Sequence, residues 1–313
     1  MESLIDIIIP TFNRASDLSE NLQLLSVQIR KDSLQDKVQI IISDNHSSDN
    51  TEKIATTFIS ANTDIRIDFF RQNENIGMEK NFVYLMSKCN SKYFMFLGDD
   101  DFLPEDYLRF CIETTSADQN LGCIIPGIYQ IDGKKKIISD PRPAKFDTER
   151  GTKGFNSMLK YSHWGHQLSG ILFLRSNVLH DYLKYDEYRN VYLFIYLAAN
   201  RILQYDVLYA PCYKISVTVT NSKYWDYNDI GLLDVVYMNY YPFLSELGPD
   251  KVGKLMLQFT LLHSYRLHMR ISSPIKLFRQ YLLLRKKTNH VRGFSASLLL
   301  MLMKDYLLLF IKK

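Results

Sequence analysis

Residues 93–104 of this 313-residue chain read YFMFLGDDDFLP, an apolar run that ends at three consecutive carboxylates, Asp99, Asp100 and Asp101. The apolar part is typical of a buried strand, and Pro104 with the acids after it suits the start of a helix. Adjacent carboxylates repel one another, and a hard divalent cation, which prefers oxygen ligands, relieves that repulsion. In open α/β sheets, ligands bind at the carboxyl ends of the strands. The stretch therefore predicts a strand leading into a metal-binding turn, with a solvated acidic helix cap as the alternative.

The first 125 residues alternate short apolar runs with amphipathic stretches. The apolar runs lie at residues 5–9, 38–43, 65–70, 93–97 and 123–125, and the amphipathic stretches at 17–30, 50–61, 78–90 and 104–117. This alternation indicates βαβ units, a mostly parallel sheet and right-handed crossovers. Residues 128–140 are typical of a hairpin with Asp132-Gly133 at its turn. From residue 229 onward the pattern is helical and rich in Leu, Tyr and Met.

Polar loops follow each of the first four apolar runs. They are Pro10–Arg14, Asp44–Thr51, Arg71–Gly77 and the three aspartates. Taken singly, each loop is explained by helix capping or a turn. Because the carboxyl ends of parallel strands share one edge of the sheet, together the loops predict a polar cleft.

Composition narrows the class of protein. The chain is 46% hydrophobic and 23% charged, which suits one large globular domain or one domain with a substantial appendage. The four cysteines form no C-x-x-C pair, so neither a zinc site nor a redox motif is indicated. The N-terminal residues lack the basic start and cleavage site of a signal peptide, so we expect a cytoplasmic protein.

The net charge of +4 hides an asymmetry between the two ends of the chain. Residues 251–313 carry 13 Lys or Arg and the single acid Asp305, a net charge of +12, whereas residues 1–250 carry −8. A nucleic-acid-binding protein normally has its positive charge on the recognition domain, so no nucleic-acid partner is expected. The leucine-rich basic residues 274–313 instead suit an interfacial amphipathic helix on an anionic membrane. Packing on the catalytic domain or on a second subunit, as in a homo-oligomer, is the alternative.

Four segments resemble a known family in both order and spacing. The segments IIIPTFNR, IISDNHSSDNT, ENIGMEKNF and YFMFLGDDDFLPEDYL, within residues 4–110, are similar to the successive motifs of family 2 glycosyltransferases. The resemblance implies the GT-A fold, an α/β, Rossmann-like, mostly parallel sheet flanked by helices, here with a helical C-terminal extension. The motif GDDDFLP is most similar to that of members that build bacterial surface polysaccharides. We expect a catalytic domain at 1–225, with a nucleotide-sugar half at 1–125 and an acceptor half at 126–225, and a basic helical region at 226–313.

The resemblance also implies a donor pocket and a metal site. The residues expected to bind the nucleotide-sugar are Pro10, Thr11, Phe12, Arg14, Asp44, Asn81 and Asp99. Asp44 would accept a hydrogen bond from the base, and Mn²⁺ or Mg²⁺ would bridge the diphosphate to Asp99, Asp100 or Asp101. Many relatives place the first acid of this motif at the position of Gly98, so which aspartate is the principal ligand is left open. A UDP-sugar is the favoured donor.

The general base is sought in the acceptor half. The resemblance implies inversion of configuration, and the acceptor hydroxyl must lose a proton to a nearby base. Asp186 and Glu187 are the first candidates, followed by His166 and His163 in SHWGHQLSG. Each also has an ordinary reading, as a helix cap or a structural histidine, and Trp164 is either a sugar-stacking ring or a core aromatic.

These expectations converge on one function and leave two alternatives. The first is an inverting, metal-dependent glycosyltransferase that moves a sugar to a hydroxyl of a glycan or lipid-linked acceptor, on the inner face of the plasma membrane. A sugar-phosphate nucleotidyltransferase is disfavoured because PTFNR lacks the glycine-rich loop that holds a triphosphate. A non-catalytic carbohydrate-binding module is disfavoured by the retention of Asp44, Asp99 and Asp100 together.

Overall fold

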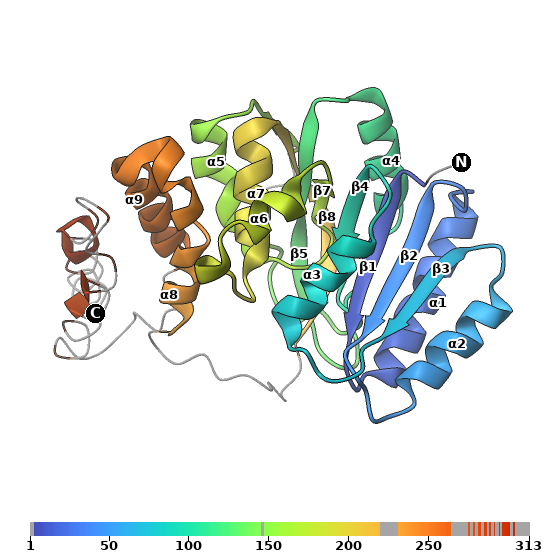
Figure 1. Ribbon diagram of the computed structural model, residues 1–313. Helices are drawn as coiled ribbons and strands as arrows, with labels where there is room; N and C mark the ends of the chain where they lie inside the picture. Colours follow the sequence, from blue (N-terminus) through green and yellow to red (C-terminus); the bar gives the residue numbers. More distant parts are fainter. Residues whose placement is uncertain are drawn as a thin grey trace.

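The computed structural model (Figure 1) describes residues 3–144, 147–219 and 231–263, with scattered positions between 275 and 303. Within these residues, eight strands form one sheet: β1 (Ile5–Thr11), β2 (Val38–Asp44), β3 (Arg66–Arg71), β4 (Tyr93–Phe96), β5 (Leu121–Ile131), β6 (Glu149–Gly151), β7 (Leu172–Leu174) and β8 (Asp206–Thr218). The α-helices are α1 (Ala15–Lys31), α2 (Thr51–Ala61), α3 (Met78–Lys88), α4 (Tyr107–Ala117), α5 (Phe155–Tyr161), α6 (Val178–Leu183), α7 (Leu193–Gln204), α8 (Gly231–Met238) and α9 (Leu244–Leu262). Short 3₁₀ helices are η1 (Ser162–His166), η2 (Asp186–Tyr188) and η3 (Tyr241–Phe243).

The sheet is parallel at one side and mixed at the other. The strand order is β3-β2-β1-β4-β7-β5-β8-β6. The first four strands in this order are parallel neighbours, and β5 is parallel to β8. β7 is antiparallel to both β4 and β5, and β6 is antiparallel to β8. The expected parallel sheet is therefore confirmed for β1 to β4, whereas the later part of the chain inserts two short antiparallel strands that the apolar pattern did not predict.

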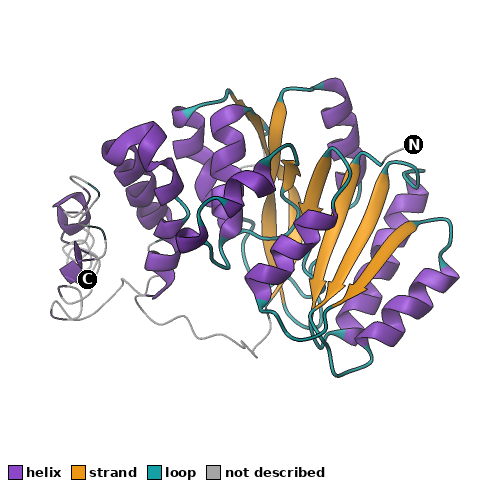
Figure 2. Cartoon of the chain, viewed as in Figure 1, coloured by secondary structure: helices purple, strands orange, loops and turns teal. Residues whose placement is uncertain are grey.

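Strand alternation places a hydrophobic core on each face of the sheet. In β1, Ile8 belongs to one core, whereas Ile7 and Ile9 belong to the other, as expected when successive side chains point to opposite faces. The first core includes side chains of α3, α5, α6 and α7, and the second includes those of α1, α2 and α4. Figure 2 shows the resulting three layers, with helices on both sides of the strands.

A buried carboxylate fixes the start of β4. Asp6 in β1 is fully buried, and its Oδ2 accepts the main-chain N–H groups of Asn90 (2.7 Å) and Ser91 (2.8 Å). The turn before β4 is thereby tied to β1, with which β4 pairs directly. This contact sets where β4 begins, and so where its carboxyl end presents the three aspartates.

The predicted hairpin is present, but its second arm is short. After β5, the main chain turns through Asp132, whose side chain accepts the N–H groups of Lys134 and Lys136, each at 2.9 Å. Isolated bridges from Ile131 to Ile137 and from Ile128 to Arg142 then replace a regular strand. The turn therefore lies at Asp132-Gly133 as predicted, but the residue with positive φ is Lys135 (62°) and not Gly133.

The helical C-terminal part packs on the first core. α8, η3 and α9 contribute buried side chains to it, and Gly248, with φ of 77°, bends α9. Four described residues of the tail are also buried in this core: Tyr281, Val291, Phe294 and Leu298. Phe294 meets Tyr237 of α8 edge-on, with ring centroids 5.3 Å apart. Among the described residues, no helix combines the length and apolar character needed to cross a bilayer.

Candidate functional site

The three aspartates form a turn at the carboxyl end of β4, where the sequence predicts a loop that lines the cleft. The Asp101 N–H donates to the Gly98 carbonyl (3.2 Å), which closes the turn. The Gly98 N–H donates to Ser169 Oγ (2.9 Å), and the Ser169 hydroxyl donates to the Asp101 carboxylate. Asp101 Oδ1 also accepts the Thr218 N–H at the end of β8 (2.9 Å). We call residues 98–101 the acid turn.

The three carboxylates of the acid turn are differently placed. Both oxygens of Asp101 accept protein hydrogen bonds, so its carboxylate joins the turn to β8 and to the segment before β7. Asp100 Oδ2 lies 2.7 Å from Arg14 Nη1, and Asp100 is the most exposed of the three. Asp99 is buried beside it. Asp99 and Asp100 are therefore the two acids left to face a ligand.

Burial dominates the protonation behaviour of the acid turn. Loss of solvent raises the pKa of Asp99 to about 8, with a further contribution from the charge of Asp100. Loss of solvent likewise raises the pKa of Asp101 to about 7, and the pKa of Asp100 is raised by burial although Arg14 opposes the shift. The positive groups of the protein therefore do not fully balance the negative charge of these carboxylates. A bound cation would supply the missing positive charge.

Arg14 links the acid turn to the start of α1. Its guanidinium pairs with Asp100 and lies 3.4 Å from Asp17 in the first turn of α1. Burial acts to lower the pKa of Arg14, but the nearby carboxylates outweigh it and the pKa is raised. Arg14 therefore stays a fixed positive charge beside the acids.

The ends of β1, β2 and β3 bring a second set of polar residues into register. Thr11 is the strand partner of Asp44, and Asp44 is the partner of Arg71. Asp44 is fully buried, and its Oδ1 accepts both the N–H (2.9 Å) and the hydroxyl (2.5 Å) of Ser47. Its Oδ2 lies 3.8 Å from Arg71 Nε and has no hydrogen-bond partner. A buried carboxylate oxygen without a donor is costly, so this position suits a ligand N–H.

The other expected donor-pocket residues differ in what they offer. Phe12 is 40% exposed, so its ring is accessible for stacking. Asn81 is buried, and its amide both accepts the Ser43 hydroxyl (2.6 Å) and donates to the Ser43 carbonyl (3.2 Å). Asn81 therefore acts on the end of β2. Pro10 is the strand partner of Ser43 and shapes the same edge.

Hydrogen bonds join the three loops at this edge. The Asn13 side chain accepts the Ser48 N–H (2.8 Å), and the Asn45 side chain bonds both Asn75 (2.9 Å) and the Ile76 N–H (3.0 Å). Arg71 donates to the Ser47 carbonyl (2.9 Å). Arg71 begins the third of the polar loops predicted from the sequence, but it was given no individual role there. Its position directly after the third apolar run was the available signal.

The candidate bases lie on two short helices. Asp186 of η2 has an 83% exposed side chain, and it pairs with Arg189 at 2.9 Å, while Glu187 is exposed beside it. His166 of η1 is half-buried, and its Nδ1 lies 2.7 Å from the His163 carbonyl. A carbonyl only accepts, so Nδ1 carries the proton. His163 itself is buried.

Trp164 belongs to an aromatic cluster. Its ring stacks on Tyr209 with centroids 5.7 Å apart and on His166 at 6.1 Å. It also packs against the first hydrophobic core. These contacts favour the core-aromatic reading of Trp164 that the sequence had left open.

A resident divalent cation fits the acid turn only with help from a ligand. Among the described residues, no three His, Cys, Asp or Glu side chains converge on a preformed metal site. Asp99 and Asp100 nevertheless supply adjacent oxygen donors with raised pKa values. Mg²⁺-type sites commonly use one or two carboxylates and complete their coordination with substrate phosphates. The donor set therefore fits a cation that arrives with a diphosphate.

Comparison with known proteins assigns the family. The chain matches the model of glycosyl transferase family 2 over residues 6–183, more than half of its length, and it belongs to that family. The abequosyltransferase RfbV of Salmonella typhimurium is 36% identical over 105 residues, which are 34% of this chain and 30% of that protein. The matched segment therefore spans less than a third of this relative.

Solved structures share the fold at low sequence identity. S. aureus TarS 1-349 in complex with UDP-GlcNAc has a TM-score of 0.68 and 12% identity, covering 94% of this chain and 83% of the TarS chain. The mannosyltransferase PcManGT from Pyrobaculum calidifontis, in complex with GDP-Man and Mn²⁺, has a TM-score of 0.54 and 16% identity, covering 98% and 88%. The α/β GT-A fold expected from the sequence is confirmed by these likenesses.

Proposed function

We propose that the protein is a glycosyltransferase that moves a sugar from a nucleotide-sugar donor to a hydroxyl of a glycan or lipid-linked acceptor in surface polysaccharide synthesis. The observation that carries the proposal is the shared sheet edge of the acid turn, Arg14 and the unsatisfied oxygen of Asp44. Family membership and the similarity to an abequosyltransferase support it. The TarS and PcManGT complexes, which hold UDP-GlcNAc and GDP-Man, support a nucleotide-sugar as donor.

The donor's two ends match the two halves of this edge. Asp44 Oδ2 would accept a base N–H, which satisfies the buried oxygen, while the exposed ring of Phe12 would stack on the base. The diphosphate would then lie toward the acid turn, where Arg14 supplies a fixed positive charge. A donor held at its base and at its diphosphate presents the sugar carbon to the acceptor in the orientation that displacement requires.

Asp99 and Asp100 would hold Mn²⁺ or Mg²⁺ together with the donor diphosphate. Such a cation neutralises the charge that develops on the leaving nucleotide without moving a proton. The mannosyltransferase PcManGT, a fold neighbour, binds Mn²⁺ together with GDP-Man. Asp101 would hold the turn, because both of its oxygens are already engaged.

The acceptor hydroxyl would lose its proton to a side chain of the second half. Inversion in one in-line displacement requires this base on the side of the sugar opposite the nucleotide. Asp186, Glu187 and His166 remain the candidates. His166 has the orientation of a base held by a third group, because its Nδ1–H donates to a main-chain carbonyl.

Nucleotide release from a panel of sugar nucleotides tests the function. We expect the wild-type protein to release free nucleotide from at least one donor in the presence of Mn²⁺ and a glycan acceptor. Asp100→Asn should reduce that release by about 100-fold or more, since it removes a negatively charged ligand of the cation that would neutralise the leaving nucleotide. Asp68→Asn, a carboxylate on β3 bonded to Gln39, is the matched control and should keep wild-type turnover.

Two outcomes would identify another class of protein, and a third would overturn the metal role. Release of pyrophosphate from a nucleoside triphosphate and a sugar phosphate would instead identify a nucleotidyltransferase. Glycan binding without turnover of any donor would identify a binding module. Full activity of Asp100→Asn, or of wild type in excess EDTA, would overturn the proposed metal role of the acid turn.

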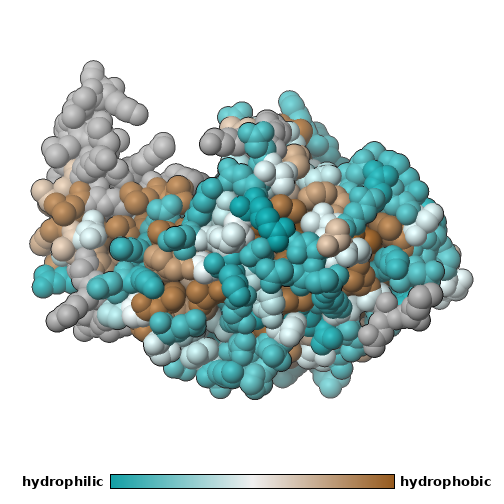
Figure 3. Space-filling view, turned by 90° about the horizontal axis from the view of Figure 1, so that it is seen from above, coloured by the Kyte–Doolittle hydropathy of each residue, from teal (hydrophilic) through white to brown (hydrophobic). Residues whose placement is uncertain are grey.

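We also propose that the basic C-terminal region holds the protein on the inner face of the membrane. Residues 274–313 are largely outside the described part of the chain, but five described apolar residues there are exposed: Ile275 (77%), Phe278 (56%), Leu282 (45%), Leu300 (69%) and Met303 (51%). The spacing of the first three, i, i+3 and i+7, is typical of one face of a helix. Figure 3 shows apolar surface gathered at the side of the molecule that carries α9 and the tail. Basic residues beside this stripe, such as Arg285 and Lys286, would meet anionic lipid.

A further inference from the structure

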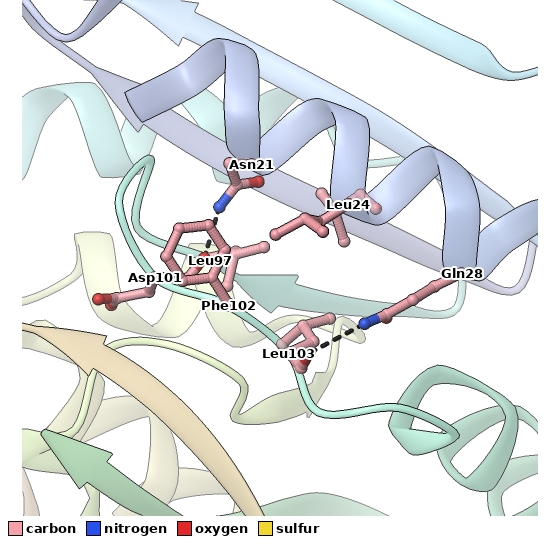
Figure 4. Close-up of a pocket in the computed structure, with 8 residues that line it drawn as sticks. Asn21, Leu24, Gln28, Leu97, Asp101, Phe102 and Leu103 are labelled. Atoms are coloured by element: carbon pink, nitrogen blue, oxygen red, sulfur yellow. Dashed lines mark hydrogen bonds between the residues drawn. The ribbon is translucent and has the colours of Figure 1, made fainter. Parts of the chain in front are cut away.

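Asn21 reaches from α1 to both ends of the acid turn. It is 1% exposed, and its Nδ2 donates to the Gly98 carbonyl (3.0 Å) and to the Asp101 carbonyl (2.5 Å). Those two carbonyls flank Asp99 and Asp100 in the chain. Figure 4 shows the Asn21 side chain lying between α1 and the main chain at Asp101. One amide group therefore spans the segment that carries both candidate ligand acids.

The orientation of this amide is fixed by its partners. Both partners are main-chain carbonyls, which only accept, so the nitrogen of Asn21 must face the turn. The Oδ1 atom has no hydrogen-bond partner. Burying the Asn21 amide with its oxygen unsatisfied destabilises the fold relative to an apolar side chain at the same position. The two hydrogen bonds that Nδ2 donates offset this loss.

The acid turn needs such restraint. Asp99, Asp100 and Asp101 are consecutive and largely buried, and their like charges favour spreading the turn apart. Ser169 and Thr218 hold Asp101 from the β7 and β8 side of the turn. Asn21 holds the main chain from the opposite side, α1, which also carries Arg14 next to its first residue.

We propose that Asn21 is a positioning residue that keeps Asp99 and Asp100 at the spacing required to bind a divalent cation with a nucleoside diphosphate. This inference rests on the proposed function of the acid turn. A ligand site binds well when its donors are held in place before the ligand arrives. Without Asn21, the turn would have to become ordered each time the cation binds, and this would lower the affinity for the cation. The contacts of the nucleotide base would not change.

The surroundings of Asn21 allow a clean substitution. A small hollow borders it, lined by Leu24, Leu25, Gln28, Leu97, Asp101, Phe102 and Leu103. Leucine has the same branching and number of heavy atoms as asparagine, and its methyl groups suit this mainly apolar lining. Asn21→Leu therefore removes both donated bonds, and with them the unsatisfied oxygen, and the adjoining hollow receives the added bulk of the methyl groups. Asn21→Asp keeps the shape but sets oxygens against the two carbonyls.

Gln28 provides a matched control on the same helix. It lies seven residues, about two turns, further along α1, so it occupies the same face. Its Nε2 donates to the Leu103 carbonyl at 2.9 Å, outside the acid turn. Gln28→Leu thus removes an amide-to-carbonyl bond between the same helix and the same loop without touching the residues between Gly98 and Asp101.

The test measures binding rather than turnover. Titration calorimetry on the full chain gives the Kd of Mn²⁺ in the presence of UDP, and the Kd of UDP in EDTA, for wild type and the three variants. We expect Asn21→Leu and Asn21→Asp to weaken Mn²⁺ binding at least about 10-fold while UDP binding in EDTA changes less than about twofold. Gln28→Leu should match wild type in both. Thermal unfolding of each variant shows that it is folded.

The outcomes distinguish this inference from the proposed function. If wild type binds UDP with Mn²⁺ but the Asn21 variants bind Mn²⁺ equally well, the positioning role is wrong and the proposed function stands. If Gln28→Leu weakens Mn²⁺ binding as much as Asn21→Leu, the effect belongs to helix packing and the inference fails. If wild type binds no nucleoside diphosphate of a panel containing UDP, GDP, CDP and dTDP, both fall. Should Asn21→Asp not fold, Asn21→Ser, too short to reach both carbonyls, replaces it.

Discussion

His163 is a buried histidine that the fold keeps neutral. It is 5% exposed, its ring packs against Trp164 at 4.7 Å, and its Nδ1 lies 3.1 Å from Nε2 of His263 at the end of α9. Burial lowers the pKa of His163 to about 4, although a main-chain hydrogen bond at Lys160 opposes the shift. The groups that face it are therefore another imidazole, an indole and a main-chain group. None of these supplies the negative charge that would stabilise a protonated ring.

This histidine should make the protein lose stability in mild acid. In the unfolded chain its pKa is about 6.5, so between pH 6.5 and 4 the unfolded state binds a proton that the folded state does not. The free energy of unfolding is therefore unaffected by His163 above pH 6.5 and falls by about 3 kcal/mol by pH 4. Urea denaturation at pH 7, 6, 5 and 4 should show a smaller loss for His163→Gln than for wild type. His180→Gln, whose side chain is 74% exposed in the native protein, should retain the wild-type loss. Parallel curves for wild type and His163→Gln would contradict the assignment.

At the scale of single residues, the sequence predicted which charged side chains lie at the site, but not the residues that hold them in position. Arg14 and Asp100 were both placed at the cleft from their positions after apolar runs, and their side chains pair. Asn21, Ser169 and Thr218 were not singled out, because each acts through hydrogen bonds to residues at least 68 positions away in the sequence. Such contacts leave no local pattern. The unsatisfied oxygen of Asp44 is likewise visible only once three strand ends are in register.

The two short helices that carry the candidate bases are held very differently. η1 packs tightly on α7: a Cβ at Gly165 would lie 2.5 Å from the Phe194 carbonyl oxygen and 2.7 Å from the Ile195 Cα. Because main-chain atoms cannot move aside, only glycine permits this approach. η2 has no buried residue. A side chain on η1 is thus fixed in place, whereas one on η2 relies on its own ion pair.

This contrast favours His166 over Asp186 and Glu187 as the base. Loss of a general base lowers turnover by about 100-fold or more. We expect His166→Gln to reduce kcat by at least that factor with donor KM little changed, whereas Asp186→Asn and Glu187→Gln stay within about fivefold of wild type. The readout is steady-state nucleotide release with a saturating acceptor, alongside thermal unfolding of each variant. A large loss for Asp186→Asn with none for His166→Gln would reverse the assignment, and no loss in any of the three would end all three candidacies.

The elements themselves were predicted well where the apolar pattern is regular. The first four strands and the helices between them lie close to the predicted ranges, because runs of Ile, Val and Phe separated by amphipathic stretches have few other ways to fold. β6 was not predicted, and β7 lies in the segment Leu168–Arg175, which the family resemblance, but not the apolar pattern, indicated as a strand. Each spans only three residues, and β7 owes its strand geometry to pairing with β4 and β5 on both sides. Pairing of that kind is a tertiary effect that a short sequence window does not contain.

Across the whole molecule, charge and apolar surface separate along the chain. The first 250 residues carry −8 and the last 63 carry +12. The described apolar residues of the tail fall into two groups: Tyr281, Val291, Phe294 and Leu298 are buried in the core, while Ile275, Phe278, Leu282, Leu300 and Met303 are exposed. The described part of the tail thus has an attached side and an outward side. Deleting it would remove core side chains, so point substitutions on the outward side are the sharper probe of membrane binding.

Substituting the exposed apolar stripe should release the protein from membranes while leaving the core intact. We expect the triple variant Ile275→Ser, Phe278→Ser and Leu282→Ser to lose the salt-resistant part of its binding to vesicles containing anionic lipid, because apolar insertion is not screened. Arg285→Gln with Lys286→Gln should instead weaken binding at low salt, by roughly 1 kcal/mol for each charge removed, and converge with wild type at high salt.

A double variant of two exposed apolar residues on α1, Leu24→Ser with Val27→Ser, controls for a general loss of apolar surface. Co-sedimentation with vesicles at low and high salt measures all four proteins, with nucleotide affinity as the check on folding. Equal partitioning of the triple variant and wild type would exclude insertion of this stripe, and a change of oligomeric state in the triple variant would assign the stripe to a contact between subunits.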